Sequence, residues 1–144
     1  MFAVTHAARR FEALSKQALL PDALSFLEGL VLAALFFESP APVKPSQLAQ
    51  SFDTTRGNIS HCVSSLEAKG LLQRKIDAND ARAYLLTLKP QGRRCALRVI
   101  SAFDRLQKEF ETKIGREDLL SLLQDLRRLE AIHEPEEAGQ AADS

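Results

Sequence analysis

The chain has 144 residues, of which 45% are hydrophobic and 26% are charged, with 19 acidic and 19 basic side chains. This composition is typical of one soluble globular domain. It excludes three classes of protein: no apolar run reaches the roughly 18 residues of a membrane span, the N-terminus lacks the features of a signal peptide, and two cysteines are too few for a disulfide framework. We therefore expect a cytoplasmic protein with no membrane partner.

Two helices and an extended segment are predicted in the first 45 residues. Apolar residues spaced three or four apart predict a first helix over residues 4–19. Asp22 is expected to cap a second helix that reaches about residue 37. That helix is apolar on nearly all sides and should form the buried centre of the domain. The prolines of residues 39–45 favour an extended segment, with a very short strand at residues 43–44.

A pair of helices is predicted next. Ser46 is a suitable N-cap for a short helix over residues 47–51. Either Thr54 or Thr55 can cap the following helix, which should end at Lys69, before a glycine. Helices that follow each other so closely, joined by a short turn, are typical of a helix-turn-helix.

A β-hairpin is predicted after these helices. Residues 71–76 and 84–88 are strand-like, and the turn-forming segment 77–83 separates them. A short helix, a turn, a second helix and a hairpin, in this order, make a winged helix-turn-helix. The second helix of such a unit can enter the major groove of DNA.

Two further helices are predicted at the C-terminal end, over residues 90–114 and 116–133, with Gly115 between them. Each carries an apolar stripe with coiled-coil spacing. An intramolecular core could account for one stripe, but three amphipathic terminal helices exceed what a small winged domain needs, so we favour a homodimer interface. Residues 134–144 are acidic and are expected to be disordered. The stripes are Val99, Phe103, Leu106, Phe110 and Ile114, and Leu119, Leu122, Leu126 and Leu129.

Basic charge is concentrated in the middle third of the chain. Residues 54–98 contain nine lysines and arginines against three acidic residues, whereas residues 99–144 contain six against eleven. A local basic excess is typical of a surface that binds phosphate groups, although a chain cut into three often shows some asymmetry. The charge pattern therefore supports a nucleic-acid interface near the predicted helix-turn-helix.

The helix that begins near residue 56 has a buried and a polar face. Its apolar positions are Ile59, Cys62, Val63 and Leu66, which form one stripe. The remaining N-terminal positions contain no acidic residue, and arginine, asparagine and serine can bond base edges or phosphates. A polar helix face can also be merely solvated, so this helix alone does not decide the function. The polar positions are Arg56, Gly57, Asn58, Ser60, His61 and Ser64.

One run of sequence makes the DNA hypothesis specific. Residues 66–88, LEAKGLLQRKIDANDARAYLLTL, followed by Gly92, resemble the wing region of the MarR (multiple antibiotic resistance regulator) family. Three upstream segments are similar to the buried helix, the support helix and the start of the recognition helix in that family. They are VLAAL at 31–35, SQLAQ at 46–50 and TRGNIS at 55–60.

The resemblance implies a homodimer whose wings straddle the DNA, with Arg82 in a minor groove and Asp80 orienting it. The narrow minor groove is strongly negative and attracts arginine, and a nearby carboxylate can fix the guanidinium direction. The alternative is a solvent-exposed loop pair that contributes little. The residues expected to contact DNA are Ser46, Gln47, Thr54, Thr55, Arg56, Gly57, Asn58, Ser60, His61, Ser64, Arg74, Lys75, Asp80 and Arg82.

We therefore expect a mainly α fold with a winged helix-turn-helix core over residues 22–89. Residues 1–21 and 90–133 should form a helical dimerisation region. The expected function is that of an effector-responsive repressor that binds a pseudo-palindromic operator in double-stranded DNA. The alternative is a winged-helix module that binds proteins and has no operator. An enzyme is not expected, because the sequence has no phosphate-binding glycine loop, no clustered His, Asp or Glu and no nucleophile motif.

No cofactor and no metal site are expected, but a small-molecule effector is. Gly29 stands where the family often has an aromatic residue. This difference could widen or reshape the pocket between the dimer helices and the DNA-binding lobe, where the family often binds small effectors. Cys62 should be buried and inert, whereas arginines near Cys95 could lower the pKa of its thiol and allow oxidant sensing. His61 and Cys62 are adjacent and so point about 100° apart on a helix, while His6 and His133 are isolated.

Overall fold

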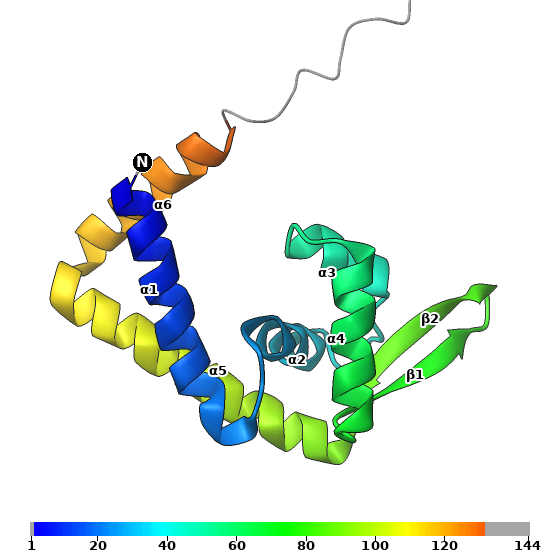
Figure 1. Cartoon of the computed structure of the whole chain (residues 1–144). Helices are drawn as coiled ribbons and strands as arrows, with labels where there is room; N and C mark the ends of the chain where they lie inside the picture. The colour runs from blue at the N-terminus through cyan, green and yellow to red at the C-terminus, as the bar shows by residue number, and fades with distance from the viewer. Residues whose placement is uncertain (1, 132–144) are drawn as a thin grey trace, which may run out of the picture. The chain divides into compact units, whose positions relative to one another are not determined.

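The computed structural model describes residues 2–131, apart from the side chains of residues 3, 4, 81, 82, 130 and 131, and the expected acidic tail lies outside the described residues. Of the described residues, 2–105 form one compact unit and 106–131 form a second. No single described helix is long and apolar enough to cross a membrane. The elements in chain order (Figure 1) are α1 Phe2–Leu19, η1 Leu20–Asp22, α2 Phe26–Glu38, α3 Pro45–Ser51, α4 Arg56–Ala68, β1 Leu72–Asp77, β2 Asp80–Leu88, α5 Pro90–Ile114 and α6 Arg116–Ala131.

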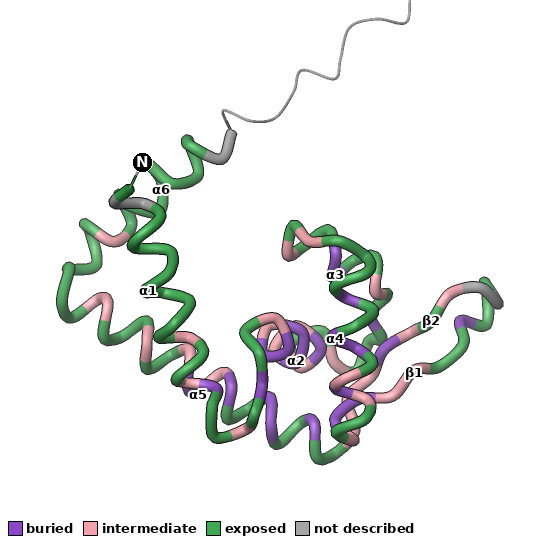
Figure 2. Tube along the Cα trace, viewed as in Figure 1, coloured by how far each residue is buried: buried purple, intermediate pink, exposed green. Residues whose placement is uncertain are grey.

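Helix α2 forms the centre of the first unit, as its apolar sequence predicts. It packs against α1, α4 and β2, and its side chains Val31, Leu32 and Leu35 are at most 2% exposed. Figure 2 shows buried residues along α2, on α4, at the base of the hairpin and in the first part of α5. A mainly α fold with a winged helix-turn-helix core is therefore confirmed.

The N-cap of α2 is Ser25 and not Asp22, so that prediction is wrong. Ser25 forms a reciprocal capping box with Glu28: its hydroxyl accepts from the Glu28 N–H at 3.2 Å, and its own N–H donates to Glu28 Oε2 at 2.7 Å. Asp22 closes the preceding 3-10 turn, and its carboxylate instead accepts from Arg98 Nη2 at 2.6 Å. Ala23 lies in the left-handed region at φ 52° and redirects the chain between the 3-10 turn and α2.

The cap of α3 also differs from the prediction. The helix begins at Pro45, two residues earlier than expected, so Ser46 lies inside its first turn and does not cap it. Proline suits the first helical position, because that N–H has no partner within a helix. The cap is Lys44, whose N–H donates to Gln47 Oε1 at 2.8 Å. Of the two threonines left open for α4, Thr55 is the N-cap.

The hairpin is longer than the sequence predicts. The two strands pair antiparallel from Leu72 opposite Leu88 to Asp77 opposite Asp80, so β2 includes residues 80–83 of the expected loop. Residues 80–83 show no strand pattern of their own. The pairing passes from Tyr84 directly to Asp80, which lies opposite Asp77, so residues 81–83 form a bulge in β2. The wing therefore extends farther from the domain.

A third extended segment closes the base of the hairpin. Val43 and Leu86 form an isolated antiparallel bridge, which confirms a very short strand in this segment. Beside it, Lys44 Nζ lies 3.1 Å from Asp77 Oδ2. The N–H of Asn79 and Lys44 together lower the pKa of Asp77 below its ordinary value. The extended segment thus contacts the hairpin twice, at Leu86 on β2 and at the outer end of β1.

Two glycines allow close contacts between elements of the first unit. A Cβ at Gly92, in the first turn of α5, would lie 1.8 Å from the carbonyl oxygen of Leu71. A Cβ at Gly29 on α2 would lie 2.8 Å from Leu19 Cδ1 and 3.3 Å from Phe103 Cζ. Leu19 and Phe103 therefore occupy the space beside Gly29, and an effect of this glycine on an effector pocket stays a prediction.

The second unit consists of the end of α5 and α6. Gly115, at φ 89°, separates the two helices at the predicted position. Helix α6 exposes apolar side chains, with exposed fractions from 36% for Leu126 to 55% for Leu129. A helix that leaves so many leucines exposed needs a further surface to cover them.

Candidate nucleic-acid interface

Helix α4 has the two faces that its sequence predicts. Its buried side chains are Ile59, Cys62, Val63 and Leu66, all at most 5% exposed. The polar set is exposed throughout: Arg56, Gly57, Asn58, Ser60, His61 and Ser64. Since no acidic side chain stands in this exposed set, it presents hydrogen-bond donors and positive charge to a partner.

The start of α4 orients its asparagine. Thr55 Oγ1 accepts from the Asn58 N–H at 3.1 Å and so caps the helix. Thr54 Oγ1 accepts from Asn58 Nδ2, also at 3.1 Å. The amide of Asn58 keeps its oxygen and a second N–H, which are the two groups needed to bond an adenine edge. Both threonines therefore position Asn58.

The wing is anchored to α4 through Arg74. Its Nη2 donates to Ser64 Oγ at 2.6 Å, its Nε lies 3.1 Å from Glu67 Oε2, and its guanidinium carbon lies 5.8 Å from the centre of the Tyr84 ring. These contacts hold Arg74 within the protein, so its main role is to fix the hairpin against α4. Lys75, on the opposite face of the strand, is exposed.

The remaining predicted DNA contacts lie on α3 and on the hairpin. Ser46 is exposed on α3, whereas the side chain of Gln47 is engaged with the Lys44 backbone. Asp80 begins β2 at the end of the hairpin. The side chain of Arg82 lies outside the described residues, so its position in a minor groove stays a prediction.

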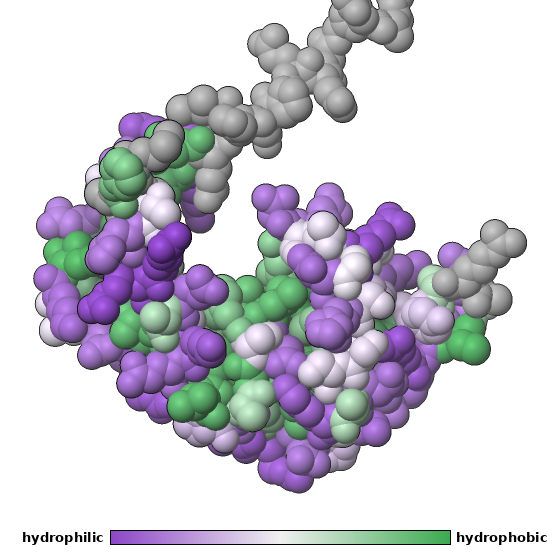
Figure 3. All heavy atoms as spheres, viewed as in Figure 1, coloured by the Kyte–Doolittle hydropathy of each residue, from purple (hydrophilic) through white to green (hydrophobic). Residues whose placement is uncertain are grey.

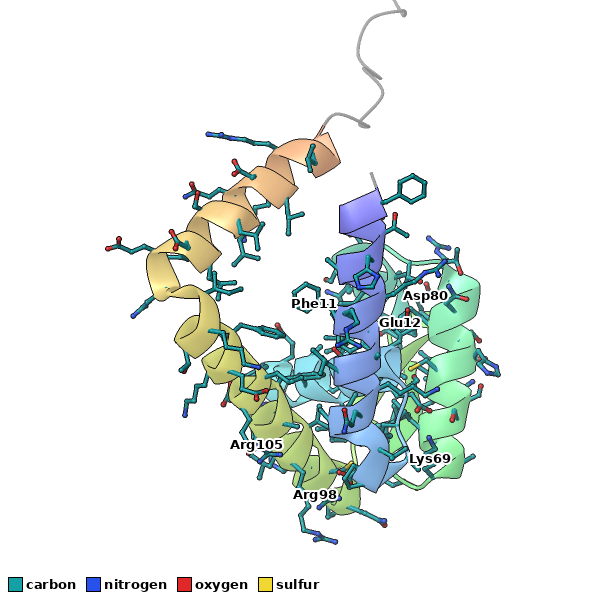
Figure 4. The ribbon with its side chains drawn as sticks, turned by 60° about the vertical axis from the view of Figure 1, so that its left-hand side comes forward. Phe11, Glu12, Lys69, Asp80, Arg98 and Arg105 are labelled. Atoms are coloured by element: carbon teal, nitrogen blue, oxygen red, sulfur yellow. The ribbon has the colours of Figure 1, made fainter. Side chains whose placement is uncertain are left out.

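The sequence analysis missed a buried ion pair that holds the other end of α4. Lys69 follows the last turn of that helix (Figure 4), and its Nζ lies 3.0 Å from both carboxylate oxygens of Glu28 and 2.9 Å from the Ala23 carbonyl oxygen. The Glu28 side chain is only 7% exposed. An acidic residue at the start of an otherwise apolar helix was the only signal in the sequence.

The electrostatics of this pair follow from its contacts. Burial alone would raise the pKa of Glu28, but hydrogen bonds from Ser65, the Ser25 backbone and Lys69 together hold it below its ordinary value of 4.5. The adjacent Cys62 shows the opposite effect: burial, then the negative charge of Glu28, raise the pKa of its thiol to about 12. Glu28 is therefore ionised and Cys62 protonated at neutral pH.

Cys95 does not have the low pKa that its arginine neighbours suggested. Burial and the negative charge of Asp22 raise the pKa of the thiol above its ordinary value, because Arg98 is already paired with Asp22. The Sγ atom lies 3.7 Å from Asp22 Oδ1. A thiol in this environment is a weak nucleophile at neutral pH.

Both cysteines are therefore expected to react slowly. At pH 8, a disulfide reagent such as Ellman's should modify them at least about tenfold more slowly in the native protein than in denaturant. The double variant Cys62→Ser and Cys95→Ser should leave DNA binding in peroxide unchanged. Release of DNA by oxidised wild type, but not by the double variant, would contradict this prediction.

An open cavity of about 370 Å³ lies between the start of α2 and α4. Asn58 and His61 of the exposed set line it, as do Ser65 and the Glu28–Lys69 pair. A small molecule in this cavity would contact side chains that are also expected to meet DNA. No group of three or more potential metal ligands occurs among the described residues.

The comparisons with known proteins agree with this geometry. Residues 29–84 match the sequence model of the MarR family. No curated protein matches the sequence. The fold is similar to that of MepR from S. aureus in complex with DNA, with 18% identity, 91% of this chain and 96% of that chain covered, and a TM-score of 0.84.

Two further solved structures are similar over nearly the whole chain. The transcriptional regulator BldR from Sulfolobus solfataricus has 26% identity and a TM-score of 0.75, with 92% of each chain covered. BpsR from Bordetella bronchiseptica, whose DNA binding is regulated by 6-hydroxynicotinic acid, has 19% identity and a TM-score of 0.79, with 90% of this chain and 91% of that chain covered.

Proposed function

We propose that this winged helix-turn-helix protein, whose residues 29–84 match the MarR family, acts as an effector-responsive repressor that binds a pseudo-palindromic operator as a homodimer. The observation that carries this proposal is the exposed face of α4, whose six polar positions include no acidic residue. A module that binds only proteins would be expected to expose apolar or acidic side chains there. No chemical reaction is assigned to the protein.

DNA binding is tested first with a random pool of duplexes. The protein should select a pseudo-palindromic site, and the logarithm of the affinity should fall linearly with the logarithm of the salt concentration, as counterion release requires. Failure to retain any duplex at low salt would exclude the regulator.

Asn58→Ala separates base reading from general DNA affinity. Loss of a bidentate contact should weaken binding to the selected site by about 1–3 kcal/mol and relax preference at one base pair. Arg94 is an exposed residue of α5. Arg94→Ala should alter the affinity for selected and random duplexes by the same factor. Equal losses on both duplexes for Asn58→Ala would exclude a base contact.

The exposed terminal helices support the homodimer. Helix α6 exposes Leu120, Leu122, Leu123, Leu126 and Leu129, and most side chains of α1 are also exposed. Covering these helices in two copies would give an interface on the order of 2,000 Å², the size found in obligate dimers. Pairing also provides two recognition helices, which must lie roughly 34–36 Å apart to read adjacent turns of DNA.

The double variant Leu122→Lys and Leu126→Lys is therefore expected to be a monomer at micromolar concentration, where the wild type is a dimer. Burying two ammonium groups in an apolar interface is unfavourable, so dissociation should abolish operator binding. Ser121→Lys and Gln124→Lys add the same charge at exposed polar positions of α6 and should leave the dimer intact. Sedimentation velocity measures the oligomeric state of the two double variants and of the wild type. A monomeric wild type would exclude the dimer.

Regulation by a small molecule would act through the cavity between α2 and α4. The cavity between α2 and α4 supports it, because Asn58 and His61 belong both to the cavity and to the face expected to meet DNA. A ligand bound there would compete for these side chains. It would therefore favour the DNA-free protein.

A further inference from the structure

The outer half of the hairpin carries an apolar pair that the fold does not use. Ile76 is 70% exposed and Tyr84 is 50% exposed, and the two residues are direct partners across the strands. Figure 3 shows apolar surface on this part of the molecule. Side chains of direct partners lie on one face of a sheet, so Ile76 and Tyr84 form a single patch.

The contacts of Arg74 establish which way this patch faces. Arg74 precedes Ile76 by two residues on β1 and therefore shares its face. Its guanidinium reaches Ser64 and Glu67 on α4 and covers one side of the Tyr84 ring. The patch thus lies on the face of the hairpin that is turned toward α4, beyond the point where Arg74 joins the two.

The position of the patch determines what it would meet on DNA. With α4 in the major groove, a hairpin beside it must pass over the phosphodiester strand that separates this groove from the adjacent minor groove. That strand presents phosphates and the apolar C–H groups of deoxyribose. We propose that Ile76 and Tyr84 pack against deoxyribose rings of this strand, an inference that rests on the proposed DNA binding.

The chemistry of the patch favours sugars over phosphates and over a protein partner. Both side chains are uncharged, and the nearby Arg74 is paired with Glu67, so the patch attracts phosphate weakly. Two side chains expose only a few hundred Å², well below the roughly 1,000 Å² of a specific protein interface. As part of a larger DNA interface the same area is useful, since it removes apolar surface from water on both partners.

Ile76→Thr and Tyr84→Thr test the contact. Each should weaken binding to selected and random duplexes alike by about tenfold, because apolar burial is lost and sugars carry no sequence information. The slope of log affinity against log salt should not change, whereas Lys75→Thr should reduce it by about one if that lysine meets a phosphate. Ile76→Val and Tyr84→Phe keep the apolar surface and should bind like the wild type.

Hydroxyl-radical footprinting of the wild-type complex provides a direct readout, because these radicals abstract hydrogen atoms from deoxyribose. Sugars on the strand between the two grooves should be protected by the wild type and exposed in complexes of the threonine variants. The inference would be overturned if these sugars were protected in both threonine variants as strongly as in the wild type. It would also be overturned if the variants lost affinity together with a smaller salt slope. A wild type that binds no duplex would instead refute the proposed function as well.

Discussion

Replacing Gly92 with alanine is expected to destabilise the protein by about 3 kcal/mol or more, the upper range for forcing extra atoms into a packed site. The new methyl carbon would lie 1.8 Å from the Leu71 carbonyl oxygen and 2.7 Å from its carbon. Both are backbone atoms and cannot rotate away. The same oxygen accepts from the N–H of Lys89 at 3.0 Å, so moving α5 to relieve the clash would break this bond.

Thermal unfolding at one protein concentration measures the effect, and the midpoint should fall by about 10 °C. Gly57→Ala is the matched control, because a Cβ there would meet nothing nearer than Thr55 Oγ1 at 3.8 Å. Alanine is favoured over glycine within a helix, so this control should be as stable as the wild type or slightly more stable. Equal stability of both variants would show that α5 does not approach Leu71 so closely.

Replacing Lys69 with methionine is expected to destabilise the protein by about 2–3 kcal/mol, because it leaves the buried carboxylate of Glu28 without its counter-charge. The expected cost is below the 3–5 kcal/mol typical of fully buried pairs, since the Lys69 side chain is 35% exposed. Methionine retains the length and the apolar stem of lysine, so the effect should report the lost charge. Lys69→Arg should restore most of the stability.

Lowering the pH should remove the difference in stability between the wild type and Lys69→Met. The pKa of Glu28 is lower in the folded protein than its ordinary value of 4.5, so the pair stabilises the fold above pH 4.5 and its contribution is lost as the pH falls through the folded pKa. The gap in unfolding midpoint between wild type and Lys69→Met should therefore narrow between pH 5 and pH 3. The double variant Glu28→Gln with Lys69→Met should lose less than the two single losses added together. A gap that is constant with pH would show that the charge of Glu28 is not involved.

Features that depend on local periodicity could be predicted from the sequence. The four buried side chains of α4 and its six exposed ones follow from the 3.6-residue repeat, because one face of a helix must pack against the domain. The apolar sequence of α2 similarly determines its central position. Gly115 and Pro90 mark helix boundaries through their own backbone preferences, and the structure confirms both.

Features that depend on residues distant in the chain required the tertiary structure. Asp22 and Ser25 are both good N-caps, and the choice between them accompanies the pairing of Asp22 with Arg98, 76 residues away. Asp80 and the bulge at residues 81–83 extend β2 only because Asp80 lies opposite Asp77 of β1. Lys69 meets Glu28 across 41 residues. The sequence by itself thus determined which faces of the helices are apolar and which polar side chains α4 exposes, since those properties repeat along a single element. The tertiary structure decided the caps, the length of the wing, the ion pair that holds α4 and the need for Gly92, because each depends on how closely two separate segments approach.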